Sequence, residues 1–288
     1  MRRWVACSSL LALACVDVGV APVEVPLYLA GTASDDPIAG KGGAQIELER
    51  AELAFGPIYL CAGAQAGDLC DAAQLEWLDA LVIDVLAPAP VEAGELRGSE
   101  GTVRSWMFDL GIVSLLTQKH PLVLPAAEQL GGASLRLEGR ATLEGVVIPF
   151  ALALAVQQED ATETGVPVIR KSGSESFSHE VGPDEPGLLI RFDARPWVTQ
   201  IDFAALLEDR SCALAGPELV CAGQTEQRCD AEGNVVELRD CAALEQVCVG
   251  ERGCVEIVEF TPDSQGYRAV RNQVVAGPRP AFTWGFSP

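Results

Sequence analysis

The sequence has few of the residues that build metal and catalytic sites. It contains two histidines, His120 and His179, and two methionines, which disfavours a copper site. Structural zinc sites often use pairs of cysteines separated by two residues, and no such pair occurs in the chain. The Gly-x-Ser-x-Gly motif of serine hydrolases is also absent. We therefore expect no cofactor, no metal and no catalytic residue, and we expect both histidines to lie in exposed loops.

Basic residues are scarce as well. The chain has 20 lysines and arginines against 41 aspartates and glutamates, which gives a formal net charge of −21. Such an acidic surface repels the phosphate backbone of nucleic acids, so we exclude a nucleic-acid partner. The composition is otherwise that of a globular protein, because 49% of the residues are hydrophobic and 21% are charged.

No apolar run is long enough to cross a membrane as a helix, which takes about 20 residues. The N-terminal run covers residues 4–14 only. It follows two arginines and ends in the small residues Ala12 and Ala14, which is the pattern of a secretory signal peptide. We therefore predict a signal peptide over residues 1–14 and an exported protein in which residues 15–21 form an N-terminal linker.

The end of this segment, Leu-Ala-Leu-Ala-Cys15, resembles the lipobox of bacterial lipoproteins. In that family the signal peptide is cut before the cysteine, whose thiol is acylated and becomes the new N-terminus. The resemblance implies that Cys15 is lipidated and that its lipid holds the protein in the bacterial cell envelope, at the outer membrane or the surface. The pattern Ala12-x-Ala14 also suits ordinary signal peptidase, whose product would be a soluble periplasmic or secreted protein.

The number of cysteines favours lipidation. The chain has ten, and nine remain once Cys7 is removed with the signal peptide. If Cys15 carries lipid, eight remain, an even number that can form four disulfides in an oxidising compartment. The alternative is that Cys15 stays free or bridges another chain. The eight predicted disulfide cysteines are Cys61, Cys70, Cys212, Cys221, Cys229, Cys241, Cys248 and Cys254.

These eight cysteines fall into two groups. Cys61 and Cys70 enclose a short segment, which predicts a small loop closed by its own disulfide. The other six lie within residues 212–254 and allow fifteen pairings, among which the sequence does not choose. So short a segment buries little core, so we expect disulfides to stabilise a separate module over residues 209–255. The cysteine spacing resembles that of small cysteine-rich modules in many exported bacterial proteins.

Alternating hydrophobicity indicates strands in the rest of the chain. Residues 135–143 and 146–156 alternate on either side of a turn at Glu144, which predicts a β-hairpin. The apolar parity of residues 46–55 reverses near Arg50. We therefore expect a β-bulge there, because a one-residue shift in parity would otherwise turn half of the strand away from the core.

Further segments complete the predicted main domain. Pro26 cannot donate to a ladder, so its strand is expected at a sheet edge or with Pro26 facing outward. Asp202 is expected to cap a short helix over residues 203–208. Together these patterns predict an all-β fold, an antiparallel β-sandwich of residues 22–208 plus 256–286, with the disulfide module inserted between late strands. Strands are expected over residues 23–29, 80–86, 94–110, 188–192, 255–260, 267–275 and 281–286.

Three hypotheses for function follow from the sequence. The first is a lipid-anchored envelope or surface protein without enzymatic activity, with a structural or interaction role and a protein or glycan partner. The second is a carbohydrate- or protein-binding module, which a row of exposed tryptophans would favour. The third is a secreted hydrolase with two carboxylates about 5–10 Å apart in a cleft. We expect core packing instead of a sugar platform for the tryptophans Trp77, Trp106, Trp197 and Trp284.

Overall fold

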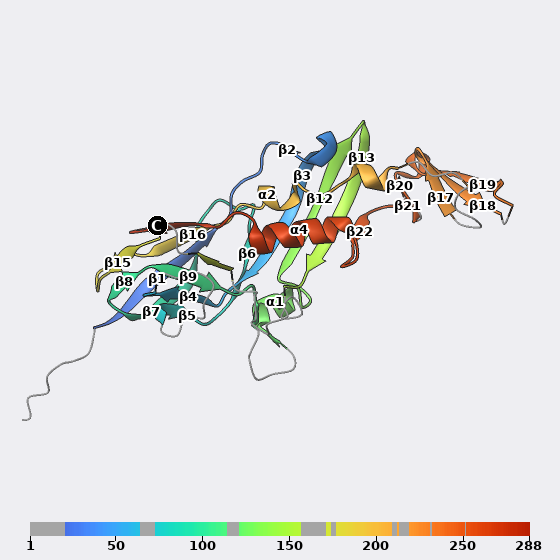
Figure 1. Ribbon diagram of the computed structural model, residues 1–288. Helices are drawn as coiled ribbons and strands as arrows, with labels where there is room; N and C mark the ends of the chain where they lie inside the picture. Colours follow the sequence, from blue (N-terminus) through green and yellow to red (C-terminus); the bar gives the residue numbers. More distant parts are fainter. Residues whose placement is uncertain are drawn as a thin grey trace, which may run out of the picture.

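The protein is elongated and is built mainly of β-strands, as expected (Figure 1). Among the residues that the structure describes, strands account for 50% and helices for 14%. A curled sheet forms one end, a second sheet and the longest helix lie in the middle, and a disulfide-rich region forms the other end (Figure 1). The computed structural model describes residues 21–63, 73–113, 121–156, 171–173, 177–208, 212, 219–230, 232–250 and 252–288.

The larger sheet has eight strands and curls into a half-barrel. Strands β1 and β16 are parallel, and the other pairs are antiparallel, so the sheet is mixed where the sequence predicted an antiparallel one. In sheet order the strands are β14 (Lys171–Gly173), β9 (Ser105–Phe108), β4 (Ile58–Cys61), β5 (Ala73–Trp77), β7 (Val91–Ser99), β1 (Pro22–Ala30), β16 (Leu188–Arg191) and β23 (Ala281–Trp284).

Strand β1 lies inside this sheet, between β7 and β16, although it contains Pro26. Pro26 pairs with Glu95 of β7, whereas the pairing with β16 begins one residue later, at Leu27. The missing amide of Pro26 therefore falls outside the β1–β16 ladder. The sequence allowed this strand either at a sheet edge or inside a sheet with Pro26 facing outward. The structure excludes the edge position.

The second sheet has six strands, of which β6 pairs with β3 beside the main order. The predicted hairpin is confirmed, with Leu135 opposite Leu154 and Leu143 opposite Val146. Its turn residue Glu144 has a positive φ of 52°, as tight hairpin turns require. In order the strands are β2 (Ile38–Ala39), β3 (Gln45–Phe55), β12 (Leu135–Leu143), β13 (Val146–Leu154) and β22 (Val258–Phe260), with β6 (Leu81–Asp84).

The predicted bulge in β3 is also confirmed. Glu138 of β12 pairs with Arg50, but the next residue, Gly139, pairs with Leu48, so Glu49 is left over. The extra residue shifts the alternation of β3 by one. As a result Leu48 and Ala51 are both buried, on either side of the bulge.

One predicted strand is wrong. Residues 267–275 belong to the helix α4 (Gln265–Ala276). The side chain of Ser264 caps this helix, because its Oγ accepts a hydrogen bond from the backbone nitrogen of Tyr267 at 3.2 Å. Tyr267, Val270 and Val274 are buried at helical spacing. The other short helices are α1 (Pro125–Gln129), α2 (Arg195–Val198), η1 (Lys41–Gly43), η3 (Ala204–Leu206) and η4 (Ala242–Leu244).

The helix predicted after Asp202 is the single 3-10 turn η3, and Asp202 accepts a hydrogen bond from the backbone nitrogen of Ala205 at 3.2 Å. Two small ladders complete the main part of the chain. They are β10 (Ile112–Val113) with β11 (Leu122–Val123), and β8 (Gly101–Val103) with β15 (His179–Val181). No helix in the described part of the chain is long and apolar enough to span a bilayer.

The disulfide-rich region of residues 212–254, here called the disulfide module, has strands of its own. A three-stranded sheet joins β17 (Leu219–Ala222), β18 (Thr225–Cys229) and β19 (Val235–Asp240), and β20 (Val247–Val249) pairs with β21 (Gly253–Val255). Val247 and Val249 pack against the main core. After the module the chain returns to both large sheets, because β22 pairs with β13 and β23 pairs with β16.

The core is one cluster of buried residues to which both large sheets contribute. Phe55, at the end of β3, is fully buried in it. The ring centroid of Phe55 is 5.1 Å from that of Phe108 and 5.1 Å from that of Phe192. Residues of both sheets therefore meet in one group of aromatic rings, and the pocket discussed below lies beside this group.

Candidate functional site

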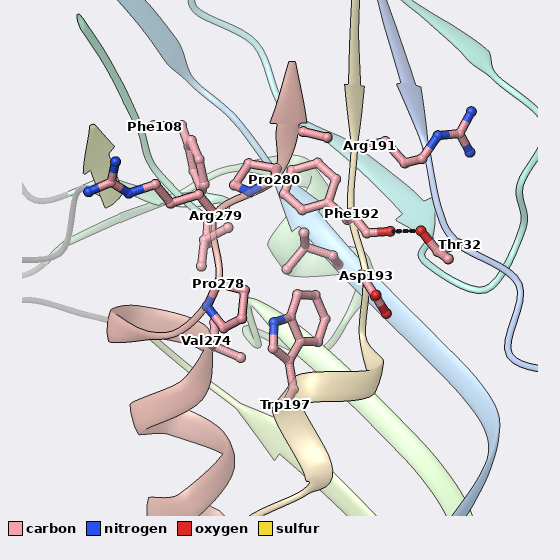
Figure 2. Close-up of a pocket in the computed structure, with 13 residues that line it drawn as sticks. Thr32, Phe108, Arg191, Phe192, Asp193, Trp197, Val274, Pro278, Arg279 and Pro280 are labelled. Carbon is pink, nitrogen blue, oxygen red and sulfur yellow. Dashed lines mark hydrogen bonds between the residues drawn. The ribbon is translucent and has the colours of Figure 1, made fainter. Parts of the chain in front are cut away.

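A pocket lies where the two large sheets, α2 and α4 meet (Figure 2). Its volume is about 220 Å³. Phe108 borders it from β9 of the larger sheet, Phe192 from the residue after β16, Trp197 from α2 and Val274 from α4. These four side chains are buried, so the pocket is bounded by well-packed apolar groups. Such a lining binds the apolar body of a small molecule, while a few polar groups set its orientation.

Backbone and side-chain hydrogen bonds fix the wall formed by residues 191–195. The hydroxyl of Thr32 donates to the carbonyl oxygen of Phe192 at 2.8 Å, a contact visible in Figure 2. The guanidinium of Arg191 donates through Nη1 to the carbonyl oxygens of Gly31 at 2.7 Å and Pro88 at 3.0 Å. Arg191 therefore ties the end of β16 to two neighbouring loops.

The carboxylate of Asp193, which also lines the pocket, is held by Arg195. Arg195 donates through Nε to Oδ1 at 2.9 Å and through Nη2 to Oδ2 at 2.6 Å. Burial raises the pKa of Asp193, but the hydrogen bonds from the side chain and backbone of Arg195 lower it by more than burial raises it. The pKa therefore lies below its ordinary value. Asp193 is the one carboxylate in the pocket lining, and it stays ionised and paired. The two carboxylates of a glycoside hydrolase are not brought together there.

The mouth of the pocket is formed by Pro278, Arg279 and Pro280, between α4 and β23. Arg279 is exposed. Within the described part of the chain its guanidinium has no hydrogen-bond or ion-pair partner. Figure 2 shows this guanidinium pointing away from Trp197. The pocket thus has an apolar interior and one unpaired cation at its mouth.

The disulfide module contains three bridges, at six of the eight predicted cysteines. Their partners, which the sequence left open, are Cys212 with Cys229, Cys221 with Cys248 and Cys241 with Cys254. The module's own small clusters of buried residues consist largely of these cysteines. The bridges therefore replace an apolar core, as expected for so short a segment.

The predicted bridge between Cys61 and Cys70 is only partly visible. Cys61 is disulfide-bonded, whereas Cys70 lies outside the described residues. The predicted signal peptide, residues 1–14, and the predicted lipidation site, Cys15, also lie outside the described residues.

One group of metal-ligand residue types occurs in the module, formed by Glu226, Cys241 and Cys254. The two sulfurs are joined in a disulfide, so neither is a thiolate that can ligate a metal. The carboxylate of Glu226 accepts a hydrogen bond from the backbone nitrogen of Cys254 at 2.8 Å. This arrangement explains the group as a structural contact between β18 and β21.

Strand β19 exposes apolar side chains at the edge of the module. Val235, Val236 and Leu238 are 45%, 60% and 65% exposed. In the order β17-β18-β19 this strand lies at the edge of its sheet. An exposed apolar edge strand is a surface that another chain can extend by strand addition.

The tryptophans named in the sequence analysis, and His179, pack against other parts of the fold. Trp77, Trp106 and Trp197 are buried in the core, which excludes a row of exposed tryptophans formed by them. The fourth, Trp284, stacks on His179 with ring centroids 4.3 Å apart. Nε2 of His179 lies 2.8 Å from a carboxylate oxygen of Glu185. His179 is therefore half-buried in strand β15, in contact with β23, so the exposed loop expected for it is wrong. The other histidine, His120, lies outside the described residues.

Comparisons with known proteins add no relative. No family model, no curated protein and no solved structure matches the chain. The arguments about function therefore depend on the residues described above.

Proposed function

We propose that this protein is a lipid-anchored protein of the bacterial cell envelope with a non-enzymatic interaction role, which holds its disulfide module away from the membrane. The observation that carries the proposal is the arrangement of the molecule. Strand β1 begins at one end, and the disulfide module forms the opposite end (Figure 1). An anchor near β1 would therefore leave the module facing outward.

The linker is short enough for this arrangement. Cys15 precedes the first residue of β1, Pro22, by seven positions. An extended chain covers at most about 3.6 Å per residue, so the start of β1 would stay within roughly 25 Å of the lipid. The larger sheet would then lie near the membrane surface.

The chemistry of the module supports export. The three described disulfides indicate an extracytoplasmic protein, because such bonds persist in oxidising compartments. The cysteine spacing that resembles modules of exported bacterial proteins fits the same location. The exposed residues of β19 lie on this module, so the interaction role is proposed for the end far from the anchor, through strand addition by a partner protein.

The scaffold fits a binding role better than a catalytic one. We propose that the two large sheets form a variant of the predicted β-sandwich, since both contribute to one core around Phe55. The pocket lining offers one carboxylate, Asp193, which is paired with Arg195. This arrangement gives no support to the hydrolase hypothesis at that pocket.

Acyl labelling in the native host tests the proposal. Wild-type protein is expected to incorporate radiolabelled palmitate and to fractionate with membranes. The variant Cys15→Ser is expected to incorporate none. Cys7→Ser is the matched control, because Cys7 lies in the predicted signal peptide and its loss leaves labelling unchanged. An unlabelled wild-type protein in the soluble fraction would overturn the anchor.

A further inference from the structure

We propose that the pocket between α2 and α4 is a binding site for a small amphipathic anion, with an aromatic or branched apolar body and one carboxylate. The proposal concerns a different part of the molecule from the lipid anchor and the disulfide module, and it does not depend on either. Three properties of the pocket carry it: its size and apolar lining, its unbalanced charge and the rigidity of its mouth.

The size of the pocket limits the ligand to a small body. A closed apolar cavity of about 150 Å³ takes one benzene molecule. The present pocket, about 220 Å³, has room for a single ring with a short side chain. Phe192 and Trp197 offer aromatic faces and Val274 an aliphatic one, so a flat or branched body would be in contact on several sides (Figure 2).

The charges around the pocket favour an anionic head group. Asp193 is neutralised by the guanidinium of Arg195, which donates to both of its carboxylate oxygens. Two arginines line the pocket. Arg191 donates to the carbonyl oxygens of Gly31 and Pro88, whereas Arg279, at the mouth, has no partner in the described part of a chain whose net charge is −21. Because its guanidinium breaks no ion pair on turning, Arg279 can reach over the mouth toward a bound carboxylate. Arginine recognises carboxylates through paired N–H donors.

The backbone holds Arg279 at the mouth. Helix α4 ends at Ala276, and Pro278 and Pro280 flank Arg279 on both sides. Each proline ring fixes its own φ and restricts the residue before it. The rim is therefore a stiff segment between α4 and β23 from which only the side chain of Arg279 has freedom to move. A stiff rim lowers the entropy lost when a ligand binds.

The test compares two probes that differ in charge and hardly in shape, phenylacetate and phenylacetamide. Binding to the purified protein is followed by NMR at the indole N–H of Trp197, assigned through the variant Trp197→Phe. Wild-type protein is expected to shift this signal with both probes and to bind phenylacetate about fivefold more tightly, the upper range for a partly exposed ion pair. The proposal is overturned if neither probe shifts the Trp197 signal, or if both bind with equal affinity.

Variants assign the effect to the mouth. Arg279→Gln is expected to weaken phenylacetate about fivefold and to leave phenylacetamide unchanged, and Arg279→Lys to restore part of the preference. Arg239→Gln is the matched control, because Arg239 is an exposed arginine of β19 in the distant module. Ala281→Trp, at an exposed position of the lining, is expected to block both probes. Retained binding in Ala281→Trp, or equal losses in Arg279→Gln and Arg239→Gln, would contradict the proposed site.

Discussion

At the scale of single residues, one ion pair on the surface joins two distant parts of the chain. It is formed by Lys41 in η1 and Asp202 before η3. Nζ of Lys41 lies 2.6 Å from Oδ2 of Asp202, across 161 positions of the chain. The hydrogen bond from Lys41 is the main reason that the pKa of Asp202 lies below its ordinary value.

This pair predicts a pH-dependent contribution to stability. A carboxyl whose pKa is lower in the folded state stabilises the fold above its unfolded pKa, about 3.9, and loses that contribution as the pH falls through the folded pKa. Lys41→Gln should therefore reduce the free energy of unfolding by about 0.2–1 kcal/mol near pH 6, a small value because the pair is partly exposed. Urea unfolding between pH 6 and pH 3 measures this difference, which should shrink as the pH falls.

The control for this series is Arg104→Gln, which removes an exposed cation that has no side-chain partner in the described part of the chain. Its effect should not follow the titration of Asp202. An effect of Lys41→Gln that stays constant from pH 6 to pH 3 would mean that Asp202 is not the group involved.

At the scale of elements, the sequence predicted those segments whose pattern is local and regular. The hairpin of β12 and β13 and the bulge at Glu49 follow from a period of two and one break in it. The segment of α4, residues 267–275, was predicted as a strand, which the structure contradicts. The neglected signals were the capping serine, Ser264, and the helical spacing of the buried residues.

Strands β17 and β19, which flank β18 on either side, allow a direct test of which apolar residues stabilise the module. Val220 is fully buried and Leu238 is 65% exposed. Val220→Lys should destabilise the module by about 3 kcal/mol or more, because it buries a charge without a partner. Leu238→Lys should change stability by less than about 0.5 kcal/mol. Hydrogen exchange of the β18 amides, which should speed up in the first variant only, measures the difference.

Equal effects of the two variants would show that Leu238 contributes to the fold of the module. The exposed apolar residues of β19 would then need no partner to explain them. Unchanged exchange in Leu238→Lys leaves this edge available for the proposed strand addition.

At the scale of the whole molecule, the sequence did not predict how the helices and strands are arranged in space. The mainly β composition and the cysteine-rich module could be predicted from hydrophobic alternation and cysteine spacing. The pocket could not, because Phe108, Phe192 with Trp197, and Val274 come from three distant segments, each of which shows only ordinary core residues. The parallel pairing of β1 with β16 and the disulfide partners have no local signal either.

The central claim is that the chain is anchored by lipid at Cys15 and carries its disulfides in the exported state. The most direct measurement is the intact mass of the protein purified from its native envelope, before and after reduction. The account predicts a chain that begins at Cys15, carries acyl mass and gains the mass of eight hydrogens on reduction. A chain that begins at Cys15 or later without acyl mass would contradict the lipid anchor, and a chain that gains no mass on reduction would contradict the disulfides.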